Sequence, residues 1–154
     1  MLKINDKIPD FEIVTDTDDF KVSNYIGKKI VVFFFPRADT SGCTAESIAF
    51  TNLQTEFEKL NCIVIGISKD NTKKQGKFRE KYNLTCELGA DFGNNVCEQF
   101  GVWVEKSMYG KKYMGIQRST FLSNEQGIIT NIWEKVKVPG HADEVLEVVK
   151  KLNS

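Results

Sequence analysis

A cysteine lies at the point where an apolar run ends and a helical pattern begins. Phe33–Phe35 is followed by Pro36, and Cys43 comes soon after, directly behind residues with short polar side chains. Thr40 or Ser41 is a good helix N-cap, so we expect Cys43 in the first helical turn. There the free backbone N–H groups and the helix dipole favour a thiolate, the reactive form of cysteine. A free cysteine can equally be a small buried side chain, so both interpretations stay open at this point.

Arg118 is the second residue whose type suits such chemistry. It stands directly before a β-rich run, Ser119–Leu122, and could approach the loop of Cys43 through the sheet. A guanidinium there would stabilise a thiolate and the charge that develops on a leaving oxygen. The alternative is a solvated charge at the end of a strand.

The spacing of the cysteines argues against a metal centre. The four cysteines stand at positions 43, 62, 86 and 97, no C-x-x-C pair occurs, and the chain has a single histidine, His141. Structural zinc sites show close ligand pairs, which are missing here. In a reducing cytosol the simplest interpretation is four free thiols, most of them buried. The alternative is that at least one of them is a nucleophile.

The order of the predicted elements indicates an α/β fold. Two continuous apolar runs, 30–35 and 62–68, are typical of strands covered on both faces, and the helical spacing between them predicts a crossover helix with parallel strands. Further predictions are helices over 72–82, 95–100 and 142–152 and a hairpin formed by 119–122 and 128–133. This order matches a thioredoxin fold with a mixed central sheet and with extra segments at the N-terminus and in the middle. We expect one domain over residues 1–154.

Composition excludes several classes of function. Lys and Arg number 21, and so do Asp and Glu. A chain without net charge has no overall field to attract nucleic acid or an anionic membrane. The N-terminal residues lack the apolar run of a signal peptide, and no window is long enough to span a membrane. We therefore expect a cytoplasmic protein.

Several segments together resemble the peroxiredoxins. Pro36-x-x-x-Thr40-x-x-Cys43 is similar to their active-site signature, and 42–46 resembles the peroxiredoxin Q branch, also called bacterioferritin comigratory protein. The segments 6–11, 100–103, 111–122 and 137–142 resemble other parts of the same family, so the similarity covers essentially the whole chain.

The resemblance implies a thiol peroxidase that reduces hydrogen peroxide and organic hydroperoxides. It makes Cys43 the peroxidatic cysteine, which attacks the peroxide and becomes a sulfenic acid. The Thr40 hydroxyl would hold the peroxide and the thiolate, and Pro36 would shield the thiolate from water. Arg118 would stabilise the thiolate and polarise the peroxide. No metal or organic cofactor is implied, because the reaction is a nucleophilic displacement with electrostatic help.

The chain departs from this branch in the residues that would recycle the enzyme. A resolving cysteine five residues after the peroxidatic one is replaced by Ile48, and a resolving cysteine in the following helix is replaced by Arg79. Cys86, in a predicted loop after the charged helix, is a possible resolving cysteine, whereas Cys62 and Cys97 are expected to be buried. We prefer one-cysteine chemistry, in which thioredoxin, glutaredoxin or glutathione reduces the sulfenic acid. We expect a monomer, with a dimer as the alternative.

Two other functions are compatible with a thioredoxin fold. A thiol–disulfide oxidoreductase normally needs C-x-x-C, and Ser41–Thr44 supplies only one sulfur. A redox sensor would use the same reactive thiol without rapid turnover. His141 is expected at the start of the last helix, outside the chemistry. Lys106, Lys111 and Lys112 are interpreted as a solvated loop, or as a docking surface for the reductant.

Overall fold

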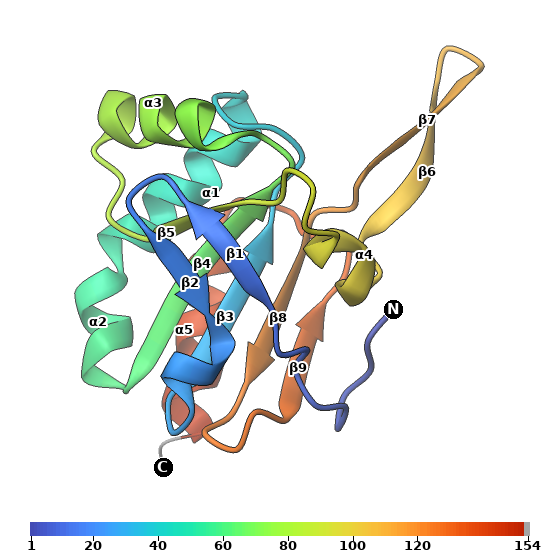
Figure 1. Cartoon of the computed structure of the whole chain (residues 1–154). Helices are drawn as coiled ribbons and strands as arrows, with labels where there is room; N and C mark the ends of the chain where they lie inside the picture. The colour runs from blue at the N-terminus through green and yellow to red at the C-terminus, as the bar shows by residue number, and fades with distance from the viewer. Residues whose placement is uncertain (153–154) are drawn as a thin grey trace.

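The computed structural model describes residues 1–152; residues 153 and 154 of the predicted 1–154 domain lie outside this part. Within it, seven strands form a mixed sheet in the order β2-β1-β5-β4-β3-β8-β9 (Figure 1). The strands are β1 (Glu12–Thr15), β2 (Asp19–Lys21), β3 (Lys29–Phe34), β4 (Cys62–Ser68), β5 (Glu87–Ala90), β8 (Ser119–Ser123) and β9 (Ile129–Trp133). β3 pairs parallel with β4, and β4 with β5, whereas the other pairs are antiparallel. The predicted parallel strands and the predicted hairpin are confirmed.

Helices flank the sheet. They are the 3₁₀-helix η1 (Val22–Tyr25) and the α-helices α1 (Ser41–Asn52), α2 (Gln54–Lys59), α3 (Thr72–Tyr82), α4 (Val96–Phe100) and α5 (His141–Leu152). Helices α1, α2, α3 and α5 contribute to one core cluster, whereas α4, η1 and the N-terminal segment contribute to the other. Within residues 1–152, no helix combines the length and the apolar character that crossing a membrane would require.

Strand β3 separates the two core clusters. Ile30, Val32 and Phe34 belong to the cluster with α4, whereas Val31 and Phe33 belong to the cluster with α1 and α5. All residues of β3 are buried, and from Ile30 onward successive side chains enter the two core clusters alternately. This explains why β3 is continuously apolar from Ile30 to Phe34, and it makes the end of β3 a rigid support for the loop that follows.

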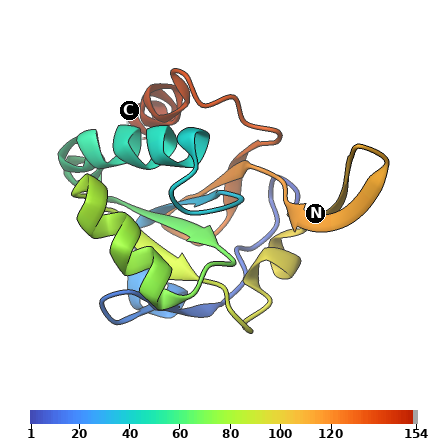
Figure 2. The same cartoon turned by 90° about the horizontal axis from the view of Figure 1, so that it is seen from above.

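The segment between α4 and β8 corrects one prediction. Lys106, Lys111 and Lys112 were expected in a solvated loop, but they lie on a two-stranded antiparallel sheet of β6 (Trp103–Met108) and β7 (Lys111–Ile116). The hairpin projects from the body, and the view from above shows it extending away from α1 and α3 (Figure 2). Its outer residues are mostly exposed, so the alternation that reveals a half-buried strand is missing from the sequence.

Two further differences concern helix and strand boundaries. The single helix expected between β3 and β4 is broken at Leu53, whose backbone leaves the helical conformation, so that α1 and α2 are separate. The apolar spacing runs on through the break, and spacing alone cannot reveal it. Strands β1, β2 and β5 were not predicted, because runs of three or four residues are too short to show a period.

Candidate active site

Cys43 lies in the first turn of α1, as predicted. Thr40 is the N-cap residue by its extended backbone, and its carbonyl accepts a hydrogen bond from the N–H of Thr44 at 2.8 Å, which begins the helix. Pro36 follows the end of β3 and starts the loop that leads to the helix. The Cys43 side chain is fully buried. A rigid strand and a helix start therefore hold the sulfur in one place.

Arg118 contacts the sulfur directly. Its Nη2 donates to Cys43 Sγ at 3.3 Å. Ser119 pairs with Phe34 in the antiparallel β3–β8 ladder, so the preceding residue, Arg118, arrives beside the end of β3. The N–H of Val136 donates to the Arg118 carbonyl at 2.9 Å and fixes the backbone there. Of the two interpretations of Arg118, the structure supports the one in which it meets the cysteine.

Glu46 is the member of this group that sequence reasoning missed. Its Oε1 accepts from Arg118 Nη1 at 2.6 Å, and its side chain is buried. Burial raises the pKa of Glu46 to about 7, although the charge and hydrogen bond of Arg118 act in the opposite direction. Because Cys43 and Glu46 are three residues apart on α1, both lie on the face that meets Arg118. That spacing, with Ser47 and Phe50 continuing the buried face, is the signal that could have found Glu46.

The guanidinium of Arg118 bridges two groups that can carry negative charge. Burial alone would lower its pKa, but the charges of Glu46 and Cys43 raise the pKa above the usual value for arginine. Arg118 thus stays cationic while it is partly buried. A fixed cation at hydrogen-bond distance from the sulfur stabilises a thiolate relative to a thiol.

Thr40 and Pro36 lie at the surface, in the loop that leads to Cys43. Both are exposed, and Thr40 Oγ1 donates to the carbonyl of Arg37 at 2.9 Å. In the described residues the Thr40 hydroxyl therefore bonds within its own loop and makes no hydrogen bond to Cys43. Its oxygen keeps lone pairs that can accept a proton donor from outside.

His141 begins α5, where it was expected, and it does not contact the sulfur. Its Nε2 and Thr120 Oγ1 are 2.8 Å apart, and both side chains are buried. Burial lowers the pKa of His141 to about 4; Glu144 opposes this shift, and the positive charge of Arg118 adds to it. A neutral imidazole thus packs against Phe50 beneath the active-site helix.

The structure does not bring Cys86 near Cys43. The Thr51 hydroxyl donates to Cys86 Sγ at 3.9 Å, and Thr51 is eight residues, or about 12 Å, along α1 from Cys43. A disulfide needs Cα atoms roughly 4.4–6.8 Å apart, so these two cysteines cannot bond in this conformation. Cys86 does follow α3 in a loop, as predicted, but it is buried, and burial raises its pKa to about 11.

The other two cysteines are buried, as expected, and they are poor nucleophiles. Burial raises the pKa of Cys62 to about 12 and that of Cys97 further still. Arg79, which the family resemblance placed where a resolving cysteine can stand, has a structural role. It forms an ion pair with Asp16 and donates to the carbonyl of Cys86 at 2.9 Å. Arg79 thus holds the loop that carries Cys86.

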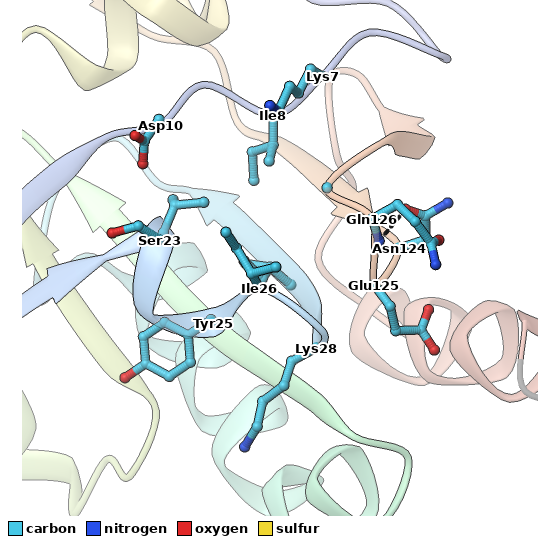
Figure 3. A pocket seen from close by; sticks show the side chains of 13 residues that line it. Lys7, Ile8, Asp10, Ser23, Tyr25, Ile26, Lys28, Asn124, Glu125 and Gln126 are labelled. Carbon is cyan, nitrogen blue, oxygen red and sulfur yellow. Dashed lines mark hydrogen bonds between the residues drawn. The ribbon is translucent and has the colours of Figure 1, made fainter.

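One cavity lies at the other end of β3 from this cysteine. A cavity of about 300 Å³ is formed by the N-terminal segment, η1 and the β8–β9 turn, and Ile8, Ile26 and Glu125 face it (Figure 3). It borders the first residues of β3, whereas Cys43 follows the last ones. Among the described residues no group of three or more His, Cys, Asp or Glu side chains is placed to hold a metal ion.

The comparisons with known proteins decide the family. Residues 4–132 match the model of the AhpC/TSA family. The chain belongs to this family. Peroxiredoxin Bcp of Bacillus subtilis is 41% identical over 153 residues, which are 99% of this chain and 98% of that protein. Peroxiredoxin Bcp of Escherichia coli K12 is 37% identical over 151 residues, 97% of each chain.

Solved structures of the same branch have the same fold. A mutant of peroxiredoxin Q from Xylella fastidiosa superposes with a TM-score of 0.94 at 33% identity, covering 100% of this chain and 99% of that one. A bacterioferritin comigratory protein of Xanthomonas campestris, studied for its alkyl peroxide reduction, gives 0.92 at 33% identity and covers 99% and 100%. The predicted peroxiredoxin Q resemblance and thioredoxin fold are confirmed. The AhpC/TSA chain described here is a thiol-dependent peroxidase.

Proposed function

We propose that Cys43 is the peroxidatic residue of this peroxidase and that it reduces hydrogen peroxide and organic hydroperoxides. The observation that carries the proposal is the 3.3 Å contact between Arg118 Nη2 and Cys43 Sγ. It pairs a cysteine in the first turn of α1 with a cation that Glu46 holds in place. Thiolate stabilisation of this kind distinguishes reactive cysteines from structural ones.

The reaction follows from these groups. The thiolate attacks one peroxide oxygen, an S–O bond forms, and the O–O bond breaks. The departing oxygen carries the electron pair and takes a proton from water, which gives water or an alcohol, while the cysteine is oxidised to a sulfenic acid. Arg118 stabilises the charge that moves onto the departing oxygen. The Thr40 oxygen accepts a hydrogen bond from the peroxide O–H and orients it for in-line attack.

We further propose that recycling uses one cysteine of this chain, and that residues 1–154 act as one domain. Cys86 contacts Thr51, which stands about 12 Å along α1 from Cys43, and the pKa values of Cys62, Cys86 and Cys97 are all raised by burial. An external thiol, from thioredoxin, glutaredoxin or glutathione, then attacks the sulfenic sulfur and displaces water. A second thiol releases the reduced enzyme.

Steady-state turnover with hydrogen peroxide and a thioredoxin system tests the proposal. Cys43→Ser should abolish turnover, whereas Cys62→Ser and Cys97→Ser, which alter buried cysteines elsewhere, should keep it. Substantial peroxidase activity in the Cys43→Ser protein would refute the assignment. Oxidation of Cys43 once per molecule, with slow recycling by every thiol tried, would indicate a redox sensor instead.

A further inference from the structure

A carboxylate from a neighbouring strand end holds the loop that leads to Cys43. Asp70 Oδ2 accepts a hydrogen bond from the backbone N–H of Ala38 at 2.7 Å. The parallel strands β3 and β4 end side by side, with Phe34 opposite Ile67. The loops that follow the two strands therefore meet at the same edge of the sheet. This is why Asp70, soon after β4, reaches the loop that follows β3.

The Asp70 carboxylate is itself held from the protein core. Its Oδ2 also accepts from Ser68 Oγ at 2.7 Å, and Ser68, the last residue of β4, is buried. The buried Gln75 Nε2 donates to Ser68 Oγ and to the carbonyl of Gly89, both at 2.9 Å. Because a carbonyl can only accept, the Gln75 amide must turn its nitrogen this way, which leaves the Ser68 proton for Asp70. A chain of hydrogen bonds thus runs from the core to the loop.

The peptide group between Arg37 and Ala38 links Asp70 to the Thr40 hydroxyl. Its N–H donates to Asp70, and its carbonyl, that of Arg37, accepts from Thr40 Oγ1 at 2.9 Å. The peptide group is planar and trans, so its N–H and its C=O point in opposite directions. Fixing the N–H therefore fixes the carbonyl to which the hydroxyl donates. The bond from the N–H to a carboxylate also makes this carbonyl oxygen a better acceptor.

The direction of the Thr40 hydroxyl matters for the reaction. While its proton is donated to the Arg37 carbonyl, the Thr40 oxygen can only accept a hydrogen bond from another molecule. This is the role that the proposed reaction requires, because the peroxide O–H donates to Thr40. If the peptide group 37–38 turned, the hydroxyl would lose its acceptor and would be free to donate to the peroxide. The peroxide would then be held in another orientation relative to Cys43.

A second anchor holds the next residue of the loop. Asp39 has a left-handed backbone conformation, with a φ of 63°, and its carboxylate accepts from the Tyr82 hydroxyl at 2.6 Å and from Lys81 Nζ at 3.0 Å. These two bonds lie at the exposed surface, where water competes for both partners. The bond from Ala38 to Asp70 is partly buried. Asp70 is therefore the stronger of the two anchors.

We propose that Asp70 is a positioning residue of the peroxidase reaction: through the peptide group 37–38 it directs the Thr40 hydroxyl to accept a hydrogen bond from the peroxide. This inference rests on the proposed function, in which Cys43 attacks the peroxide and Thr40 orients it. Asp70 acts on the orientation of the peroxide, whereas stabilisation of the thiolate is left to Arg118.

The test measures the rate constant for oxidation of Cys43 by hydrogen peroxide in single-turnover stopped-flow experiments. Asp70→Ala should lower it about tenfold. Asp70→Asn keeps an oxygen that accepts from the Ala38 N–H and should stay within about twofold of the wild type. The pH dependence of Cys43 alkylation by iodoacetamide should be unchanged in Asp70→Ala, because the contact with Arg118 is kept.

A double-mutant cycle shows whether Asp70 acts through Thr40. Thr40→Val removes the hydroxyl, and within residues 1–152 this side chain makes no capping hydrogen bond, so α1 should still begin at the same place. In the Thr40→Val protein, Asp70→Ala should lower the rate constant by at most about twofold further, because the hydroxyl that it directs is absent. Ser68→Ala removes the buried donor to Asp70 and should slow oxidation about threefold, again only when Thr40 is present. It provides the same test if Asp70→Ala does not fold.

The control variant is Asp16→Ala, which removes a buried carboxylate that pairs with Arg79 in the last turn of α3. It should lower the midpoint of urea unfolding and leave the rate constant unchanged. A wild-type rate constant in Asp70→Ala would overturn the proposal, and so would a tenfold loss that persists in the Thr40→Val protein. Equal slowing by Asp16→Ala would also overturn it, since the effect would then be a general loosening. In each case oxidation still depends on Cys43, whereas failure of the proposed function would leave Cys43→Ser active.

Discussion

The free energy of unfolding of the reduced protein should change little between about pH 4.5 and 6.5, because two buried groups near Cys43 oppose each other there. Glu46 has its pKa raised from 4.5 to about 7. His141 has its pKa lowered from 6.5 to about 4. Both side chains are at most 5% exposed. Their effects on stability therefore have similar size and opposite sign in the same pH range.

The magnitudes follow from linkage. The folded protein holds the Glu46 proton more tightly than the unfolded chain does. The contribution of Glu46 to the free energy of unfolding is therefore complete below pH 4.5 and is lost as the pH rises to about 7. At about 1.4 kcal/mol per pKa unit, this loss is up to ~3 kcal/mol. For His141 the unfolded chain holds more protons, so stability is gained from about pH 4 to 6.5. That gain is somewhat smaller, because His141 borders an open cavity of about 460 Å³ where water screens its charge.

Two variants separate the opposing effects. Glu46→Gln keeps a hydrogen-bond acceptor for Arg118. The free energy of unfolding of this variant should rise by ~2 kcal/mol from pH 4.5 to 6.5, because only the His141 effect remains. His141→Asn should show the reverse, a fall of ~2–3 kcal/mol over the same range. Urea unfolding followed by tryptophan fluorescence, under reducing conditions and in small pH steps, measures both slopes. Glu147→Gln, an exposed change on α5, serves as the control and should match the wild type.

The comparison of slopes decides the outcome. If the free energy of unfolding depends on pH in the same way for Glu46→Gln and for the wild type, Glu46 does not titrate in this range. The account in which burial raises the pKa of the Glu46 carboxyl would then be wrong. A His141→Asn protein with a wild-type slope would contradict the corresponding account of the neutral imidazole.

Three further predictions concern single side chains. Gly42→Ala would place a Cβ 3.2 Å from Arg118 Nη2, so the oxidation of Cys43 in stopped-flow measurements should slow about tenfold. The free energy of unfolding should stay equal or rise by up to ~1 kcal/mol, because alanine favours the helix more than glycine does. Wild-type oxidation rates would contradict it. Cys86→Ser should leave the rate of peroxide turnover unchanged; finding a peptide in which Cys86 is disulfide-bonded to Cys43 after oxidation of the wild type would refute one-cysteine recycling. Lys29→Met removes a buried ammonium bonded to Glu125 and should lower the unfolding free energy by ~1–3 kcal/mol in urea titration, with turnover retained. Equal midpoints would show that this buried pair adds nothing.

Much of the sheet could be predicted because its central strands are buried on both faces. β3 and β4 are continuous apolar runs, and their type is recognisable from sequence. The projecting β6–β7 hairpin was missed because neither strand packs a regular face against the core. The break at Leu53 was missed because the apolar spacing continues through it.

The site was predicted in part for similar reasons. Cys43 could be found because the start of a helix is a local feature. The link between Glu46 and Arg118 joins residues 72 positions apart and depends on the β3–β8 register, which the sequence does not reveal. The position of Cys86 beside Thr51, far along α1, likewise needed the structure. Long-range placement, more than residue type, separates what could be predicted from what could not.

The most direct test of the central claim is the mass of the reduced protein after one equivalent of hydrogen peroxide, without reductant, followed by digestion. Attack by Cys43 predicts the gain of one oxygen atom, located on the peptide that contains Cys43 and absent from the Cys43→Ser protein. An oxygen found on Cys62, Cys86 or Cys97 while Cys43 stays unmodified would contradict the account.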